Sequence, residues 1–156
     1  MERTAEQVVY ERELAIAATP ETVWGLLADP AKIVRWMGVN AELDARPGGA
    51  YRIEVLPGSV ASGEVVELDP PRRLVLSWGW EPGVDGPNPV PPGSSTVEFE
   101  LVPTAAGTTL RFTHRGLPDA AAAERHAQGW DHYLDRLTVA APGGNPGSDP
   151  WLNNKQ

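Results

Sequence analysis

The longest regular pattern in the sequence is a helical stripe near its C-terminus. Five apolar residues are separated by four, three, four and three positions: Ala123, Ala127, Trp130, Leu134 and Leu137. A helix places all five on one face. Asp119 offers a start signal and Pro142-Gly143-Gly144 a stop, which predicts a helix from about 119 to about 141. Such a stripe must be buried against another layer of the same chain.

Most of the preceding sequence alternates between apolar and polar residues, as half-buried strands do. The first such segment is 8–17, and Thr19-Pro20 and Asp29-Pro30 then each predict the start of a short helix, the second ending at Gly38. Further alternating segments follow at 39–44, 51–55, 63–68, 74–80, 97–101 and 109–115. The short connection 105–107 predicts a hairpin between the last two.

This order predicts an α+β protein with a helix-grip fold. A curved antiparallel sheet of about six to seven strands would wrap around the long C-terminal helix, with two short helices after the first strand. We expect one domain over residues 1–141 and a polar tail over 142–156, in which Trp151 and Leu152 are the exceptions and which docks locally or frays.

Composition excludes several classes of function. The 156 residues include 21 acidic and 13 basic side chains, a net charge of −8, which opposes binding to nucleic acid or anionic lipid. The absence of cysteine excludes disulfides, thiolate metal sites and a thiol nucleophile. The N-terminus lacks the apolar run of a signal peptide, and no run of about 18 apolar residues occurs. We therefore expect a cytoplasmic protein without membrane insertion.

Short stretches in a fixed order also carry a family resemblance: IAATPETVW (16–24), DPAKIVRWMG (29–38), RPGG (46–49), GEVVELDPPRRL (63–74), GTTL (107–110), THRGL (113–117) and GW (129–130). Over about residues 8 to 141 the chain resembles the START-like (SRPBCC, birch-pollen-allergen-like) superfamily, and within it the family of homologues of the activator of the heat-shock protein 90 ATPase. The resemblance implies an elongated apolar cavity between sheet and helix. The co-chaperone that gives the family its name has a further domain ahead of this one, and with a first strand near residue 8 we expect no chaperone activation.

Candidate ligand-binding residues follow from strand parity and helix spacing. Six tryptophans are unusual beside two phenylalanines and three tyrosines, and large aromatic side chains facing one interior suit an apolar or aromatic ligand. The alternative is that they only fill the core. The candidates are Trp36, Tyr51, Ile53, Trp78, Trp80, Phe99, Phe112, His114, Trp130 and Leu134.

His114 is the candidate with acid–base chemistry, because its parity with Leu110 and Phe112 points it to the concave face. It would be either a polar anchor or general acid/base in the cavity, or a structural histidine with satisfied hydrogen bonds. His126 and His132 lie off the apolar stripe of the last helix and are expected on solvated faces. The three histidines lack metal-ligand spacing.

No other motif indicates catalysis or a cofactor. No serine stands in a G-x-S-x-G elbow, and no glycine-rich phosphate loop is present. The proline-rich segment 81–95 is interpreted as a surface loop, with a flap or dimer contact as the alternative. The sequence thus predicts binding of a small hydrophobic or aromatic molecule without a cofactor or metal. The alternatives are a cyclase, dehydratase or hydrolase using the same cavity, and a protein-interaction module that forms a homodimer or contacts a chaperone.

Overall fold

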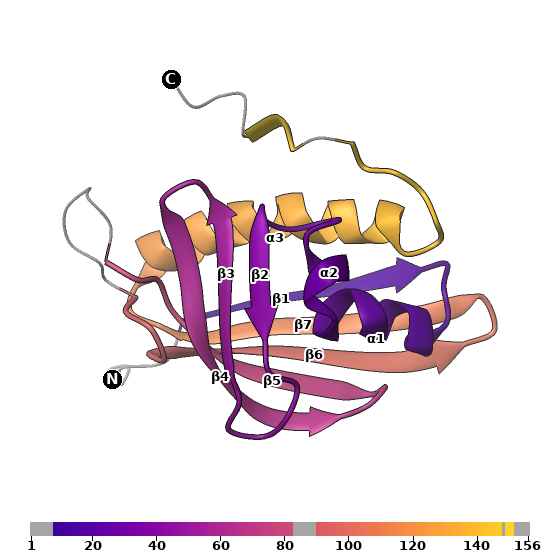
Figure 1. The fold of residues 1–156 in the computed structure, drawn as a ribbon, viewed down its shortest axis with the longest axis horizontal. Helices are drawn as coiled ribbons and strands as arrows, with labels where there is room; N and C mark the ends of the chain where they lie inside the picture. Colours follow the sequence, from indigo (N-terminus) through magenta and orange to yellow (C-terminus); the bar gives the residue numbers. More distant parts are fainter. Residues whose placement is uncertain (1–7, 83–89, 148, 152–156) are drawn as a thin grey trace, which may run out of the picture.

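The computed structural model describes residues 8–82, 90–147 and 149–151. Within these ranges one antiparallel sheet has the strand order β1-β7-β6-β5-β4-β3-β2 (Figure 1). Its strands are β1 (Val8–Ile16), β2 (Asn40–Leu43), β3 (Ala50–Leu56), β4 (Ser59–Asp69), β5 (Arg73–Trp78), β6 (Ser95–Thr104) and β7 (Gly107–Leu117). The helices are α1 (Pro20–Ala28), α2 (Pro30–Ile33) and α3 (Ala120–Ala140). The predicted α+β helix-grip fold is confirmed.

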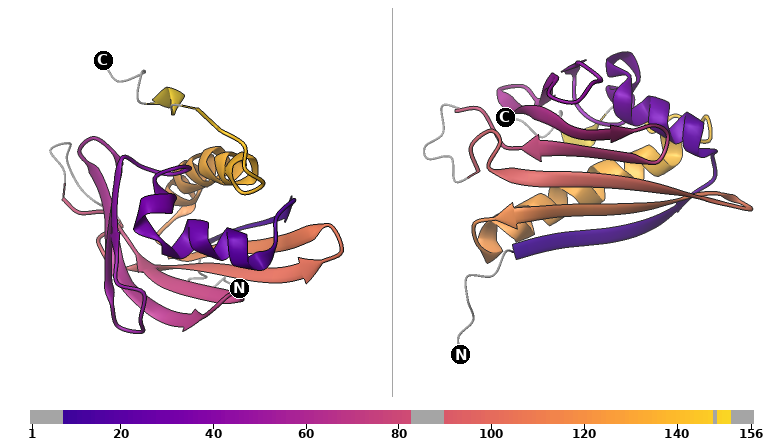
Figure 2. Two further views of the ribbon diagram at one scale, coloured as in Figure 1. Left: turned by 45° about the vertical axis from the view of Figure 1, so that its right-hand side comes forward. Right: turned by 90° about the horizontal axis from the view of Figure 1, so that it is seen from below.

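The long helix α3 begins where its capping residue predicts. The Asp119 carboxylate accepts a hydrogen bond from the Ala122 backbone N–H at 2.9 Å, satisfying one of the donors that a helix start leaves open. Figure 2 shows α3 on the concave side of the sheet. At its outer face Arg12 of β1 contacts Asp131 at 3.1 Å and Asp135 at 2.7 Å. These ion pairs tie the helix to the edge strand.

The second short helix is shorter than predicted. α2 ends at Ile33, and Trp36 and Met37 follow it in a turn before Gly38, whose φ of +88° suits glycine. Both side chains are nevertheless buried. The Trp36 indole N–H donates to the Leu26 carbonyl of α1 at 2.8 Å, so a tertiary hydrogen bond holds the turn where helical spacing predicted another helical turn.

Two strand boundaries also differ from the sequence pattern. β4 is longer than expected. β5 stops at Trp78, so Trp80 lies beyond its end, where it takes part in an isolated bridge with Ala61. The backbone at Gly79 passes so close to Pro91 that a Cβ atom would lie 1.8 Å from the Pro91 carbonyl oxygen. The segment that leads into β6 therefore packs against the backbone at Gly79, where β5 has ended. Of the predicted loop 81–95, residues 83–89 lie outside the described residues, and Ser95 already belongs to β6.

Candidate functional site

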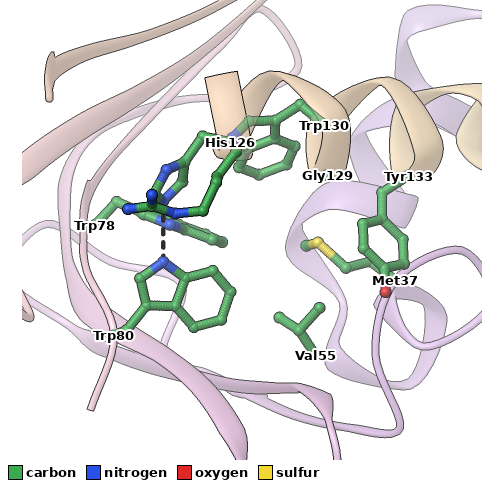
Figure 3. Close-up of a pocket in the computed structure, with 9 residues that line it drawn as sticks. Met37, Val55, Trp78, Trp80, His126, Gly129, Trp130 and Tyr133 are labelled. Carbon is green, nitrogen blue, oxygen red and sulfur yellow. Dashed lines mark hydrogen bonds between the residues drawn. The ribbon is translucent and has the colours of Figure 1, made fainter. Parts of the chain in front are cut away.

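A pocket of about 220 Å³ lies between α3 and the sheet, and we call it the inner pocket. Its walls come from β3, β5, the turn after α2 and one face of α3. Figure 3 shows the labelled side chains arranged around one space, with Trp80 and His126 across from Met37 and Tyr133. The lining residues are Met37, Val55, Trp78, Trp80, Arg125, His126, Gly129, Trp130 and Tyr133.

Three tryptophans make up much of the wall. Trp78 at the end of β5 lies against Trp130 of α3, with ring centroids 5.0 Å apart, and meets Trp80 edge-on at 6.0 Å. Trp80 is two residues beyond Trp78 and keeps its parity, so both rings reach the concave side. Tilted and edge-to-face contacts of this kind are favourable arrangements of aromatic rings. The pocket therefore has an aromatic wall built from both layers of the fold.

Trp80 is held by a histidine of α3. The Trp80 indole N–H donates to Nε2 of His126 at 3.0 Å (Figure 3). Nδ1 of His126 is 2.7 Å from the Ala122 carbonyl oxygen. A carbonyl oxygen can only accept, so Nδ1 carries the hydrogen and the unprotonated Nε2 accepts from Trp80. Burial lowers the pKa of His126, and the charge of Arg125 lowers it further, against the effect of the Ala122 hydrogen bond. The neutral imidazole thus links the helix to the pocket wall.

His114 is fully buried on β7 and forms a continuous hydrogen-bond chain. The Trp130 indole N–H donates to its Nδ1 at 3.0 Å, and its Nε2 lies 2.8 Å from Ser95 Oγ. Ser95 in turn donates to the Trp78 carbonyl at 2.9 Å. With the serine proton used in that way, Nε2 of His114 must be the donor to Ser95.

These hydrogen bonds occupy both ring nitrogens of His114, so neither is available to a ligand. His114 is absent from the pocket lining and its side chain is fully buried. Burial, aided by the nearby His126, lowers the pKa of His114 to about 3. The geometry is that of a structural histidine which positions Trp130, and it gives an acid–base role no free proton acceptor.

Two buried donors next to these groups have no partner within the described residues: the Trp78 indole nitrogen and the Tyr51 hydroxyl. The two rings stack, with centroids 5.7 Å apart. Burial raises the pKa of Tyr51 well above its ordinary value. Buried polar groups normally find a partner, so a donor without one on a pocket-lining residue is unusual.

A second space of about 330 Å³, which we call the outer hollow, adjoins the inner pocket. It shares Val55, Trp80, Arg125, His126, Gly129 and Tyr133 with the inner pocket and adds Leu56, Ser59, Val90 and Trp151. Because these two spaces share six residues, they lie side by side, and both are partly open to solvent.

The C-terminal tail supplies one side of the outer hollow. Asp149 is buried and accepts hydrogen bonds from the Tyr133 hydroxyl at 2.9 Å and from the Trp151 backbone N–H at 2.9 Å. It also lies 2.8 Å from Nε2 of His132, whose ring stacks on Trp151 with centroids 3.8 Å apart. The tail residues 149–151 therefore dock on α3. Leu152, the other apolar residue of the tail, lies outside the described residues.

Metal binding and membrane spanning find no support in the described ranges. No three histidine or acidic side chains there are grouped to hold a metal ion. No helix in the same ranges is both long and apolar enough to cross a bilayer.

Comparison with known proteins establishes the family. A family model described as "Activator of Hsp90 ATPase homolog 1-like protein" matches residues 17–141. The chain belongs to this family. It is thereby placed in the START-like (SRPBCC) superfamily, as the sequence resemblance predicted. A comparison with curated proteins gave no significant match.

Several solved structures share this fold. The chain is 45% identical to an AHSA1-like protein from Rhizobium etli, with a TM-score of 0.75 over 97% of this chain and 92% of that one. It is 29% identical to CalU16 from Micromonospora echinospora, with a TM-score of 0.71 over 96% and 72% of the two chains. A protein from Mesorhizobium loti is 27% identical, with a TM-score of 0.68 over 85% and 94%.

Within this family member, three of the predicted site residues line the inner pocket: Trp78, Trp80 and Trp130. The other candidates are buried but lie outside the pocket lining: Trp36, Tyr51, Ile53, Phe99, Phe112, His114 and Leu134. Parity and spacing identified inward-facing residues correctly, but they do not distinguish a side chain at a void from one packed on all sides.

Six lining residues were not predicted: Met37, Val55, Arg125, His126, Gly129 and Tyr133. The expectation that His126 and His132 face solvent was wrong, since both are half-buried in specific contacts. A second helical stripe carries the missing signal. Ala122, His126, Gly129 and Tyr133 are spaced by four, three and four residues, beside the stripe of purely apolar residues.

Proposed function

We propose that this protein binds a small hydrophobic or aromatic molecule in the inner pocket. The observation that carries the proposal is an aromatic wall of three tryptophans around a space of about 220 Å³ that is partly open to solvent. Close packing is the default in protein interiors. A void with rigid aromatic walls and an outlet therefore favours a binding role over core filling.

Gly129 supports the same proposal. A Cβ atom at this position would meet nothing within 4 Å, so no packing contact requires a glycine here. Glycine inside a helix costs about 1 kcal/mol relative to alanine. Gly129 therefore lowers the stability of α3 at a position that faces the pocket. The missing side chain leaves space there for a ligand.

The expected affinity follows from the area that a ligand would bury. A two-ring aromatic that loses about 200 Å² of apolar surface to the pocket gains about 5 kcal/mol, which corresponds to a Kd of about 0.2 mM. Titrations should therefore cover micromolar to millimolar concentrations.

The test uses 2-naphthalenemethanol, a neutral two-ring probe, titrated by calorimetry and by NMR of the tryptophan indole N–H signals. We expect saturable binding to the wild-type protein and a loss of at least tenfold in affinity for Gly129→Leu, whose side chain would occupy the pocket. The matched control is Gln128→Leu, which adds the same side chain at an exposed position of α3 and should keep the affinity within twofold. Absence of saturable binding to the wild type, or unchanged affinity in Gly129→Leu, would overturn the proposal.

A further inference from the structure

Arg125 is a charged group at the pocket that has no counter-charge among the residues the structure describes. It lines both the inner pocket and the outer hollow. Most other arginines of the described residues pair with carboxylates, as Arg12 and Arg52 do, or donate to backbone oxygens, as Arg136 does. Arg35, away from the pocket, has no such partner either among these residues. Among the same residues no ion pair or hydrogen bond of the Arg125 side chain is present. Its guanidinium is therefore available to a ligand.

The surroundings of Arg125 are unusual for so acidic a protein. The chain carries a net charge of −8, yet no aspartate or glutamate of the described residues lines the inner pocket or the outer hollow. From the same residues the lining holds one permanent positive charge, on Arg125, and the half-buried His126. Locally the potential thus favours an anion, against the sign of the protein as a whole.

One pocket-lining residue also carries an unused hydrogen-bond donor. The buried indole nitrogen of Trp78 has no partner among the residues that the structure describes, and the residue is 1% exposed. An oxygen atom on a bound ring is the natural acceptor for an indole N–H, which can only donate. The lining thus includes one residue with a buried, unpaired donor, Trp78, and one cation, Arg125.

The volume limits the ring system. A cavity of about 150 Å³ lined by apolar side chains accommodates benzene, and the inner pocket has about 220 Å³. One aromatic ring fits with room to spare and two fused rings fill the space. A charged substituent then lies towards the outer hollow, where Arg125 is.

We propose that the ligand is a one- or two-ring aromatic carboxylate that carries an oxygen substituent on the ring. The ring lies against Trp78, Trp80 and Trp130, the carboxylate pairs with Arg125, and the ring oxygen accepts a hydrogen bond from the Trp78 indole. A planar guanidinium suits the two oxygens of a carboxylate. This inference rests on the binding function proposed above and specifies its ligand class.

The charge preference is tested by comparing 2-naphthoate with 2-naphthalenemethanol in calorimetric titrations at pH 7.5. We expect the wild type to bind the carboxylate at least tenfold more tightly. In Arg125→Gln the ratio of the two affinities should fall to within twofold of one, whatever the affinity for the neutral probe. Arg35→Gln, at an arginine away from the pocket, is the matched control and should keep the preference.

The outcomes separate the two proposals. Equal binding of both probes by the wild type, or an equal loss of both in Arg125→Gln, overturns the carboxylate assignment and leaves the binding function intact. Failure of both probes to bind the wild type overturns the binding function itself.

The ring-oxygen contact has its own measurement, which needs no change in the binding site. Addition of 6-hydroxy-2-naphthoate should shift the NMR signal of the Trp78 indole N–H, assigned by its loss in Trp78→Phe, and slow its exchange with solvent deuterium. 2-Naphthoate, which lacks the hydroxyl, should produce no such slowing. An indole signal of Trp78 with the same exchange rate in both complexes would overturn this contact.

Discussion

At the scale of single residues, His114 is held in one tautomer by Trp130 on one side and Ser95 on the other. Protonation would place a second N–H against the Trp130 donor and introduce a charge into a fully buried site. The fold therefore stabilises the neutral imidazole. The neutral Nδ1 accepts from the Trp130 indole N–H and so fixes that ring at the pocket wall.

This arrangement predicts an acid-dependent loss of stability. The pKa of His114 in the folded protein is about 3, below its ordinary value of 6.5, so the unfolded chain takes up the proton first. Stability from this group is complete above pH 6.5 and falls as the pH drops towards 3. We expect the free energy of unfolding, measured in urea, to decrease by roughly 2 kcal/mol between pH 7 and pH 5.

Two variants identify the group responsible. His114→Gln should be less stable at pH 7 but show a flatter pH dependence, because it has no imidazole to titrate. Ser95→Ala removes only the hydroxyl beside Nε2 and should retain the wild-type slope. A slope in His114→Gln as steep as in the wild type would show that other groups are responsible.

At the scale of elements, α3 and the tail residues 149–151 together form the outer part of the site. Asp149 joins them because it accepts from both Tyr133 and the Trp151 backbone. Burial by itself would raise the pKa of Asp149, but these hydrogen bonds and that with His132 lower it below its ordinary value. The docked tail therefore depends on an ionised carboxylate.

Replacing that carboxylate should release the tail. We expect Asp149→Asn to weaken docking, because a neutral amide accepts less strongly than a carboxylate and competes with its own N–H groups. Acrylamide quenching of tryptophan fluorescence should rise in this variant and not in Asp131→Asn, where an exposed carboxylate of α3 is changed. An unchanged quenching constant would mean that Trp151 is held by stacking on His132 alone.

Helices and strands that depend on interactions between nearby residues were predicted correctly from the sequence. The α3 stripe and the β6–β7 hairpin follow from periodicity and a short turn, and both are present. The end of β5 was missed because the approach of Gly79 to Pro91 is a contact between distant segments. The partners of His126 were missed for the same reason, since Trp80 lies 46 positions earlier in the chain.

At the scale of the whole molecule, the fold was predictable because one amphipathic helix and several amphipathic strands have few ways to bury their apolar faces. For the pocket, the sequence predicted which residues face the interior but not which of them border the open space. Whether Phe112 or Tyr133 borders a void depends on packing to within a few ångströms, which periodicity does not contain. Phe112 is in fact packed against Trp130, with ring centroids 4.4 Å apart.

The strand order predicts how stability is distributed over the sheet. β6 and β5 lie in its middle, whereas β2 is a four-residue strand at one edge. Backbone hydrogen bonds at a short edge open more easily than those in a paired interior. Hydrogen–deuterium exchange followed by NMR should show the slowest amides in β5, β6 and β7 and the fastest strand amides in β2. Protection of β2 equal to that of β6 would contradict this ranking.

The division of the pocket between two layers has a thermodynamic consequence. Trp78 and Val55 belong to the sheet, whereas Gly129 and Tyr133 belong to the last helix, so neither layer alone holds the site. A ligand that binds only the assembled pair must shift the equilibrium between detached and docked α3 towards the docked form. The free energy that holds the helix on the sheet therefore increases with ligand concentration. Binding can then be measured as a rise in the melting temperature of the protein.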